Sequence, residues 1–201
     1  GVGLGIRDLA RGGTGRLLDG GGRDQFDSGS FSQGGGYYLG FGDFVNLGND
    51  ADTYLGSRYN FGWGAHGGIG HFYEAGGNDY YRTRQIVAAG LAWDRSLALF
   101  QDAGGDDQYD MGDFSLGASA LGSAAVFLDR QGEDQYRGVT PASSNQEPPN
   151  LSLFFDLGSE QNTLNGQLLE KNCRYRESLS VTFAVDSVEE ARFEFCTPAN
   201  D

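Results

Sequence analysis

The chain has 201 residues, with 28 acidic side chains against 14 lysines and arginines, and its formal net charge is −14. Proteins bind nucleic acids and anionic membranes through lysine and arginine, so this charge argues against both as partners. No apolar run approaches the ~18 residues of a transmembrane helix, and we expect no membrane-spanning segment. Glycine is abundant, with 34 residues, but it follows no G-X-Y period, and 14 phenylalanines and 10 tyrosines provide apolar surface for a folded core.

The first three quarters of the chain contain a repeated motif with the consensus D-x-G-G-x-D-x-Y. Its second aspartate falls at Asp24, Asp52, Asp79, Asp107 and Asp134, and a degenerate sixth copy covers residues 156–163. Successive copies are therefore 27 or 28 residues apart. Such regular spacing indicates a repeat architecture.

Each unit has a short apolar segment of β type before the glycine turn, as in residues 68–73 and 97–100, and a second one after it. The unit is too short for a propeller blade, lacks the spacing of leucine-rich repeats and shows no helical period. All four prolines lie outside the repeats, where no ladder hydrogen bond is lost. We therefore predict an all-β fold, a right-handed parallel β-helix of five to six coils over residues 1–164, with about 27 residues per coil.

Stacked coils turn the repeat into columns, because each residue lies ~4.8 Å from its counterpart in the next coil. One column is predicted to be an aromatic ladder of Phe26, Tyr54, Tyr81, Tyr109 and Tyr136. Glycines mark positions where the backbone has a positive φ or approaches another strand closely, namely Gly34, Gly36, Gly62, Gly64, Gly90 and Gly117.

The C-terminal part of the chain departs from the repeat. Residues 139–150 contain proline, serine and asparagine and are predicted to form an inserted loop. The repeat ends near residue 164, and residues 165–201 are predicted to form a cap. Within that cap, 179–186 and 191–196 alternate apolar and polar residues and predict a β-hairpin that covers the end of the solenoid.

The two cysteines, Cys173 and Cys196, lie in the final 30 residues. Their spacing suits one disulfide, which would stabilise the fold by ~3 kcal/mol in the chain-entropy model. The alternative is two unrelated buried thiols. The pair, the acidity and the presence of a single lysine favour an oxidising compartment.

The repeats, together with residues 32–36, 62–70 and 90–96, resemble a family of predicted bacterial secreted proteins. Those proteins carry units of roughly the form Q-G-x-G-x-x-x-G-x-G-x-L-x-D-x-G-G-x-D-x-Y and have no activity that we can name. The resemblance covers about residues 15–164 and implies an extracellular or cell-envelope location. Phe61 and Ala89 depart from it, because they stand where the family has glutamine.

Two columns of carboxylates flank the glycine turns. One contains Asp19, Glu74, Asp102, Asp129 and Asp156, and the other contains Asp24, Asp52, Asp79, Asp107 and Asp134. Like charges at this spacing repel by about 1 kcal/mol even in water, so something must offset them. Calcium would do so, with Asp24, Asp52, Asp79, Asp102, Asp107, Asp129 and Asp134 as candidate ligands. Alternatively, each aspartate accepts hydrogen bonds from the backbone of its own turn and needs no metal.

Tyr38, His66 and Asp94 are each 28 residues apart, so a regular stack places them on one face of consecutive coils. The aspartate would orient the imidazole, which could then act as an acid or base near neutral pH. Beside them, a platform for stacking on sugars is expected from Trp63, Trp93 and Tyr37. The alternative is a polar network that packs a corner of the solenoid. His71 shows no comparable partners and is expected to be a surface or strand residue.

The most distinctive residues of the chain belong to the repeat, as is typical of a structural scaffold. This favours a non-catalytic secreted or envelope-attached module that presents a rigid acidic surface to a protein or glycan. Assembly through the solenoid ends is a further expectation. The alternative is a carbohydrate-active enzyme, a polysaccharide hydrolase or lyase. It would use Tyr38, His66 and Asp94, or the carboxylates near Asp107.

Overall fold

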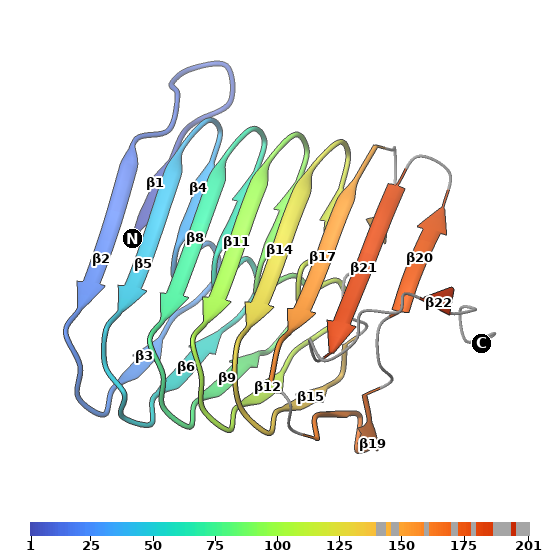
Figure 1. The fold of residues 1–201 in the computed structure, drawn as a ribbon. Coiled ribbons are helices and arrows are strands. Elements are labelled where there is room, and N and C mark those ends of the chain that lie inside the picture. The colour runs from blue at the N-terminus through green and yellow to red at the C-terminus, as the bar shows by residue number, and fades with distance from the viewer. Residues whose placement is uncertain are drawn as a thin grey trace.

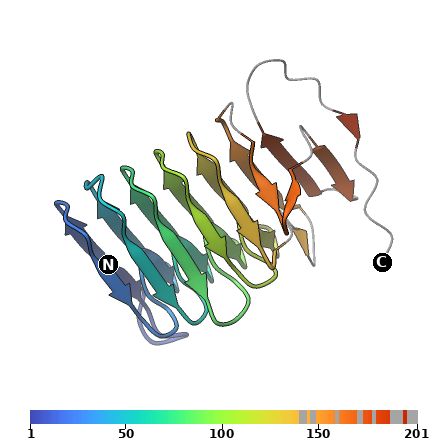
Figure 2. The same ribbon diagram turned by 90° about the horizontal axis from the view of Figure 1, so that it is seen from below.

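A computed structural model of the chain describes residues 1–139, 144–145, 149–158, 161–169, 173–177, 180–186 and 194–195. In this part the chain winds as a parallel β-solenoid, and its coils lie side by side in Figures 1 and 2. The described residues contain no α-helix, and so none of sufficient length and apolarity to span a membrane. The predicted fold class is confirmed.

Each coil contributes one strand to each of three sheets, which we number in the order in which a coil visits them. Sheet I contains β2 (Thr14–Asp19), β5 (Phe41–Asn46), β8 (Ile69–Glu74), β11 (Leu97–Asp102), β14 (Ala124–Asp129), β17 (Leu151–Asp156), β21 (Ser180–Asp186), β20 (Cys173–Glu177) and β22 (Glu194–Phe195). Sheet II contains β3 (Gln25–Asp27), β6 (Thr53–Gly56), β9 (Tyr80–Thr83), β12 (Gln108–Asp110), β15 (Gln135–Arg137), β18 (Thr163–Leu164) and β19 (Gln167–Leu168). Sheet III contains β1 (Val2–Leu4), β4 (Gly35–Tyr37), β7 (Trp63–Ala65), β10 (Leu91–Trp93), β13 (Ser119–Ala120) and β16 (Ser144–Asn145).

The strand register matches the sequence repeat. Asp102 at the end of β11 pairs with Glu74 in the coil before it and with Asp129 in the coil after it. These steps equal the 28- and 27-residue spacing of the motif, so each repeat is one full coil.

The core between sheets I and II contains two aromatic ladders. The predicted ladder on sheet II is confirmed, with successive rings nearly parallel and centroids 4.8–5.2 Å apart. A second ladder on sheet I has the same spacing, 4.7–5.2 Å, and consists of Phe44, Phe72, Phe100, Phe127 and Phe154. Rings of the two ladders meet edge to face, which is a preferred geometry for aromatic pairs.

Sheets I and III approach each other closely because small residues line both. A Cβ added at Gly70 would lie 2.0 Å from the carbonyl oxygen of Trp63, and one added at Gly42 would lie 2.0 Å from that of Gly35. The predicted glycine roles are confirmed. Gly34, Gly62, Gly90 and Gly117 have positive φ, whereas Gly36 and Gly64 lie against the backbone of sheet I. The outer face of sheet III is covered by a separate apolar cluster that contains Trp63, Val87 and Leu91.

The C-terminal hairpin is formed by different strands from those we predicted. β21 pairs antiparallel with β20, whereas β22 pairs with β20 and not with β21. The other edge of β21 pairs in parallel with β17, which extends sheet I past residue 164. The expected loop at 139–150 likewise contains β16, which continues sheet III beside β13. Cys196 lies outside the described residues and Cys173 is described only as backbone, so the disulfide stays a prediction.

Candidate functional site

Both carboxylate columns point into the solenoid. At the turn from sheet I to sheet II, eight of their members are no more than 2% exposed, namely Asp52, Glu74, Asp79, Asp102, Asp107, Asp129, Asp134 and Asp156. Asp24 is partly exposed, because no described coil precedes its own on that side. The columns themselves therefore do not form the acidic surface that we expected. The exposed acidic side chains of these turns are instead Asp50, Asp106 and Glu133.

The first column caps its own turn. The Oδ1 atom of Asp102 accepts the backbone N–H of Gly104 at 3.1 Å, and that of Asp19 accepts the N–H of Gly21 at 2.9 Å. The second oxygen accepts a tyrosine hydroxyl from sheet II, as when the Tyr81 hydroxyl donates to Asp102 Oδ2 at 2.7 Å. The first column therefore makes the hydrogen bonds to its own turns that the alternative predicted.

The second column caps the coil before its own. The Oδ1 of Asp107 accepts the backbone N–H of Asp79 at 2.7 Å, and the Oδ1 of Asp134 accepts that of Asp107 at 2.8 Å. These hydrogen bonds connect neighbouring coils, in addition to the pairing of strands within each sheet. An aspartate that capped its own turn would not make this connection.

Five of the seven candidate metal ligands come together. Asp79, Asp102 and Asp107 form one group, and Asp107, Asp129 and Asp134 form another, with one carboxylate oxygen of each member within 4.8 Å of the others. Burial raises the pKa of Asp107, and the charge of Asp102 raises it further. Burial likewise raises the pKa of Asp79 to about 8. Asp24 and Asp52 belong to neither group.

The Tyr38, His66 and Asp94 row is assembled as the spacing predicts. The His66 ring stacks on Tyr38 with centroids 4.7 Å apart, and its Nδ1 lies 2.7 Å from Asp94 Oδ2. All three residues have positive φ, so the row follows the bend from sheet III to sheet I. The side chains of His66 and Asp94 are 32% and 33% exposed, which leaves them open to a ligand.

The expected sugar platform loses one of its three members. Trp63 is fully buried, and its indole N–H donates to the carbonyl oxygen of Ser32 at 2.8 Å. Trp93 and Tyr37 remain partly exposed, and the Tyr37 ring meets His66 edge to face at 5.2 Å. Trp63 faces the same side of sheet III as Tyr37 and Trp93, because both of those residues pair with Ala65, two positions further along β7. It is buried because the rings of Phe31 and Tyr59 pack against it, each with its centroid 5.4 Å away.

A second histidine site was missed. On the outer face of sheet I, His71 Nδ1 lies 2.8 Å from Asp43 Oδ1, while Arg16 pairs with the other oxygen of Asp43 at 3.0 Å. The expectation that His71 lacks partners is therefore wrong. The missed signal was the spacing, because Asp43 precedes His71 by 28 residues.

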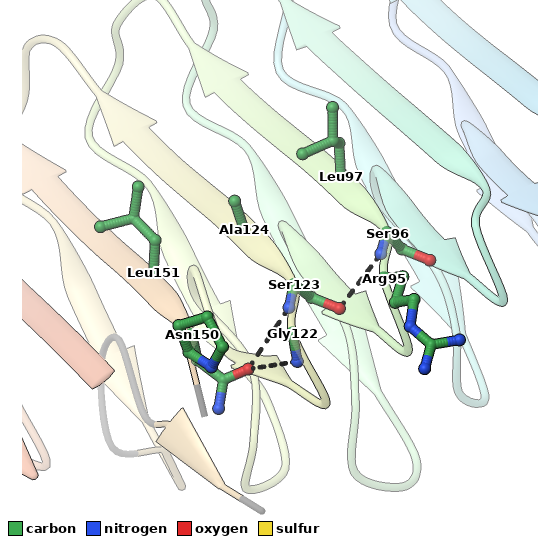
Figure 3. Close-up of a pocket in the computed structure, with 9 residues that line it drawn as sticks. Arg95, Ser96, Leu97, Gly122, Ser123, Ala124, Asn150 and Leu151 are labelled. Carbon is green, nitrogen blue, oxygen red and sulfur yellow. Dashed lines mark hydrogen bonds between the residues drawn. The ribbon is translucent and has the colours of Figure 1, made fainter. Parts of the chain in front are cut away.

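A shallow depression lies at the corner of sheets III and I, near the C-terminal coils (Figure 3). Leu97, Ala124 and Leu151 line it, beside a polar row of Ser96, Ser123 and Asn150. Ser123 Oγ accepts the Ser96 N–H at 3.1 Å, and Asn150 Oδ1 accepts the Ser123 N–H at 3.3 Å. These side chains therefore connect neighbouring coils.

Comparisons with protein-family models, with curated protein sequences and with solved structures found no match.

Proposed function

We propose that the chain is a non-catalytic module of a secreted or cell-envelope protein, in which the solenoid is a rigid support for binding a glycan. The observation that supports it most is the placement of the repeated polar residues. Both carboxylate columns and the tyrosine hydroxyls are used inside the molecule, where they hold turns and coils together. Repeated residues whose side chains form hydrogen bonds inside the molecule stabilise the scaffold. We therefore look for the binding function among solvent-accessible residues that do not repeat.

The proposed binding surface is a strip of five partly exposed residues whose identities do not repeat, Tyr37, Tyr38, His66, Trp93 and Asp94. Exposed aromatic rings offer flat apolar faces on which sugar rings can stack. His66 and Asp94, joined at 2.7 Å, provide donors and acceptors for hydroxyl groups. The strip follows consecutive coils, which suits an extended chain of sugars better than a single small molecule.

The secreted location belongs to the same proposal. Its support is the resemblance of the D-x-G-G-x-D-x-Y repeats to bacterial secreted proteins, together with the strongly acidic composition. A protein partner is the other class that the exposed acidic turns would suit.

Affinity electrophoresis through gels that contain soluble polysaccharides tests the proposal. We expect at least one polysaccharide to retard the native protein, with loss of retardation in Trp93→Ala. Tyr80, which is partly exposed and lies outside the strip in β9 of sheet II, provides a matched control, and Tyr80→Ala should bind as the native protein does. Equal migration of all three proteins in every gel would contradict glycan binding.

One observation favours catalysis as a second function. Asp94 contacts Nδ1 of His66, and no hydrogen bond to His66 Nε2 is present among the described residues. This arrangement could orient the ring for acid–base work. The same polysaccharides should therefore be screened for turnover with native protein and with His66→Asn, since asparagine tolerates the positive φ at this position. Turnover that disappears in His66→Asn would establish an enzyme, and absence of turnover with retained binding would support the module. The carboxylate of Asp107 is fully buried and cannot reach a polysaccharide.

A further inference from the structure

Five buried carboxyl groups lie in two overlapping groups at the bend that joins sheet I to sheet II. The bend follows the ends of β8, β11 and β14, and it precedes the starts of β9, β12 and β15 (Figure 1). The groups are Asp79, Asp102 and Asp107, and Asp107, Asp129 and Asp134. All five side chains are at most 2% exposed. None of the ion pairs among the described residues involves them.

Turn capping leaves part of this cluster unsatisfied. In Asp107 and Asp134, Oδ1 accepts a backbone N–H from the preceding coil. The Oδ2 atom of each is buried and has no hydrogen-bond partner. A buried oxygen without a donor is costly, and a buried negative charge without compensation costs far more.

The chain shows what satisfies the equivalent oxygen elsewhere. One coil has Asn46 in the first column, where the later coils have Glu74, Asp102 and Asp129. Asn46 Nδ2 donates to Asp52 Oδ2 at 2.6 Å. Where aspartate replaces this asparagine, the donor is lost and a second carboxylate stands in its place. A cation bound between the two carboxylates would offset their negative charges.

We propose that two calcium ions bind inside the solenoid, one among Asp79, Asp102 and Asp107 and one among Asp107, Asp129 and Asp134, with Asp107 shared between them. Two divalent cations carry four positive charges against the five negative charges of the ionised carboxylates. The hydroxyl oxygens of Tyr81 and Tyr109 stand beside these groups, because they donate to Asp102 and Asp129 at 2.7 Å, and they can serve as neutral ligands.

Calcium fits this setting better than magnesium. Both are hard cations that prefer oxygen ligands, but magnesium keeps several waters, whereas calcium accepts cages of carboxylate and other protein oxygens. A site whose ligands are at most 2% exposed leaves little access for water from outside. The same burial means that the ions would enter as the coils close during folding.

The test therefore loads or removes the metal during refolding. The full chain is unfolded in guanidinium with a chelator, desalted, and refolded in calcium, in magnesium or in chelator, and its metal content and melting temperature are measured. We expect about two calcium ions per chain and a melting temperature at least about 5 °C higher in calcium than in chelator. Magnesium should produce neither effect.

Two variants locate the ions. Asp107→Asn retains the Oδ1 that caps Asp79 and should abolish both ions. Asp134→Asn should retain one ion. Asparagine is compatible with this column, because Asn162 occupies it one coil later and accepts the backbone N–H of Asp134. Asp24→Asn is the matched control, in the same column but outside both groups, and should keep two ions.

Refolded native protein that holds less than about 0.2 calcium ions per chain, and melts at the same temperature with or without calcium, would overturn the proposal. In that case protons would neutralise the carboxyl groups. Equal metal content and stabilisation in magnesium would overturn the assignment to calcium.

Discussion

At the scale of single residues, the buried acids divide their oxygens between two tasks. In the first column, one oxygen holds the glycine turn and the other holds a tyrosine hydroxyl from the opposite sheet. This explains why the repeat ends on tyrosine, although a phenylalanine ring would fill the same space in the ladder. The two ends of this column lack the hydroxyl, because Phe26 stands in the first copy and Leu164 in the sixth, and both are only partly buried.

Removal of one of these hydroxyl groups tests its contribution. Tyr136 is fully buried and donates to Asp156 Oδ2 at 2.9 Å. We expect Tyr136→Phe to lower the free energy of unfolding by about 1–3 kcal/mol, because the carboxylate loses a buried donor. Urea denaturation measures the change. Tyr80→Phe is the control, since Tyr80 is partly exposed and its 3.3 Å bond to Asp110 should contribute little. Equal losses in the two variants would contradict this account.

The raised pKa of Glu74 predicts an unusual dependence of stability on pH. Its burial raises the pKa of the carboxyl to about 9, although the hydrogen bond from Tyr54 opposes the shift, whereas an unfolded glutamate titrates near about 4.3. Between these values the folded state of Glu74 binds more protons than the unfolded state, so the stabilisation that this group contributes is complete below about pH 4 and is lost as pH rises towards 9.

The measurement is urea denaturation of chelated protein at pH 5, 7 and 9. We expect the free energy of unfolding to fall with pH, and Glu74→Gln to remove part of the slope, at most about 1.4 kcal/mol per pH unit. Identical slopes in the native protein and the variant would show that Glu74 does not titrate in this range.

At the scale of elements, the distance between sheets I and III depends on which small residue occupies each coil. Gly70 faces the backbone of β7, whereas Ala98 takes the same position one coil later and packs with Ala92. Near the C-terminal end, Ser119 and Ser152 meet through their hydroxyl groups at 2.6 Å. The separation of these sheets is therefore fixed coil by coil.

Gly70→Ala should push the two sheets apart locally. Its Cβ would lie 2.0 Å from a backbone oxygen, which cannot move without shifting a strand. We expect a loss of about 1–3 kcal/mol in the free energy of unfolding. Gly13→Ala is the matched control, because a Cβ there meets nothing within 4 Å, and it should change stability by less than about 0.5 kcal/mol. A loss no larger than that of the control would contradict the close-packing argument.

At the scale of the whole molecule, stability depends on contacts between neighbouring coils. Both aromatic ladders and the aspartate caps connect each coil only to the next. In such arrays, the terminal units need protection, because they expose strand edges and core. The pairing of β21 with β17 and of β20 with β21 provides two more strands at the C-terminal end of sheet I.

The disulfide prediction concerns this end of the molecule. Cys173 begins β20 and pairs with Glu194, two positions before Cys196 in the sequence. We expect thiol titration of the unfolded, unreduced protein to find no free thiols, and to find two after reduction. Loss of the bridge by Cys196→Ser should lower stability by ~3 kcal/mol. Two reactive thiols before reduction would contradict both the bridge and the oxidising compartment.

The sequence by itself determined the period, the fold class, the tyrosine ladder, the glycine turns and the alignment of Tyr38, His66 and Asp94. The reason is that a solenoid converts sequence spacing directly into spatial neighbours. Counting by 27 or 28 residues therefore located contacts between coils, and the same counting would have found Asp43 beside His71.

Only the tertiary structure decided which way side chains face. The sequence suggests that the repeated aspartates are surface charges, yet they are buried, because backbone N–H groups and tyrosine hydroxyls inside the bend donate hydrogen bonds to their carboxylate oxygens. From the sequence, we expected Trp63 to be available for stacking on sugars. In the structure it is covered by residues of the segments that connect sheets II and III. The strands of the hairpin were also decided by tertiary contacts, since β17 offers β21 an open edge. Spacing fixes the neighbours in a column, but inward or outward orientation depends on how three sheets close around a common interior.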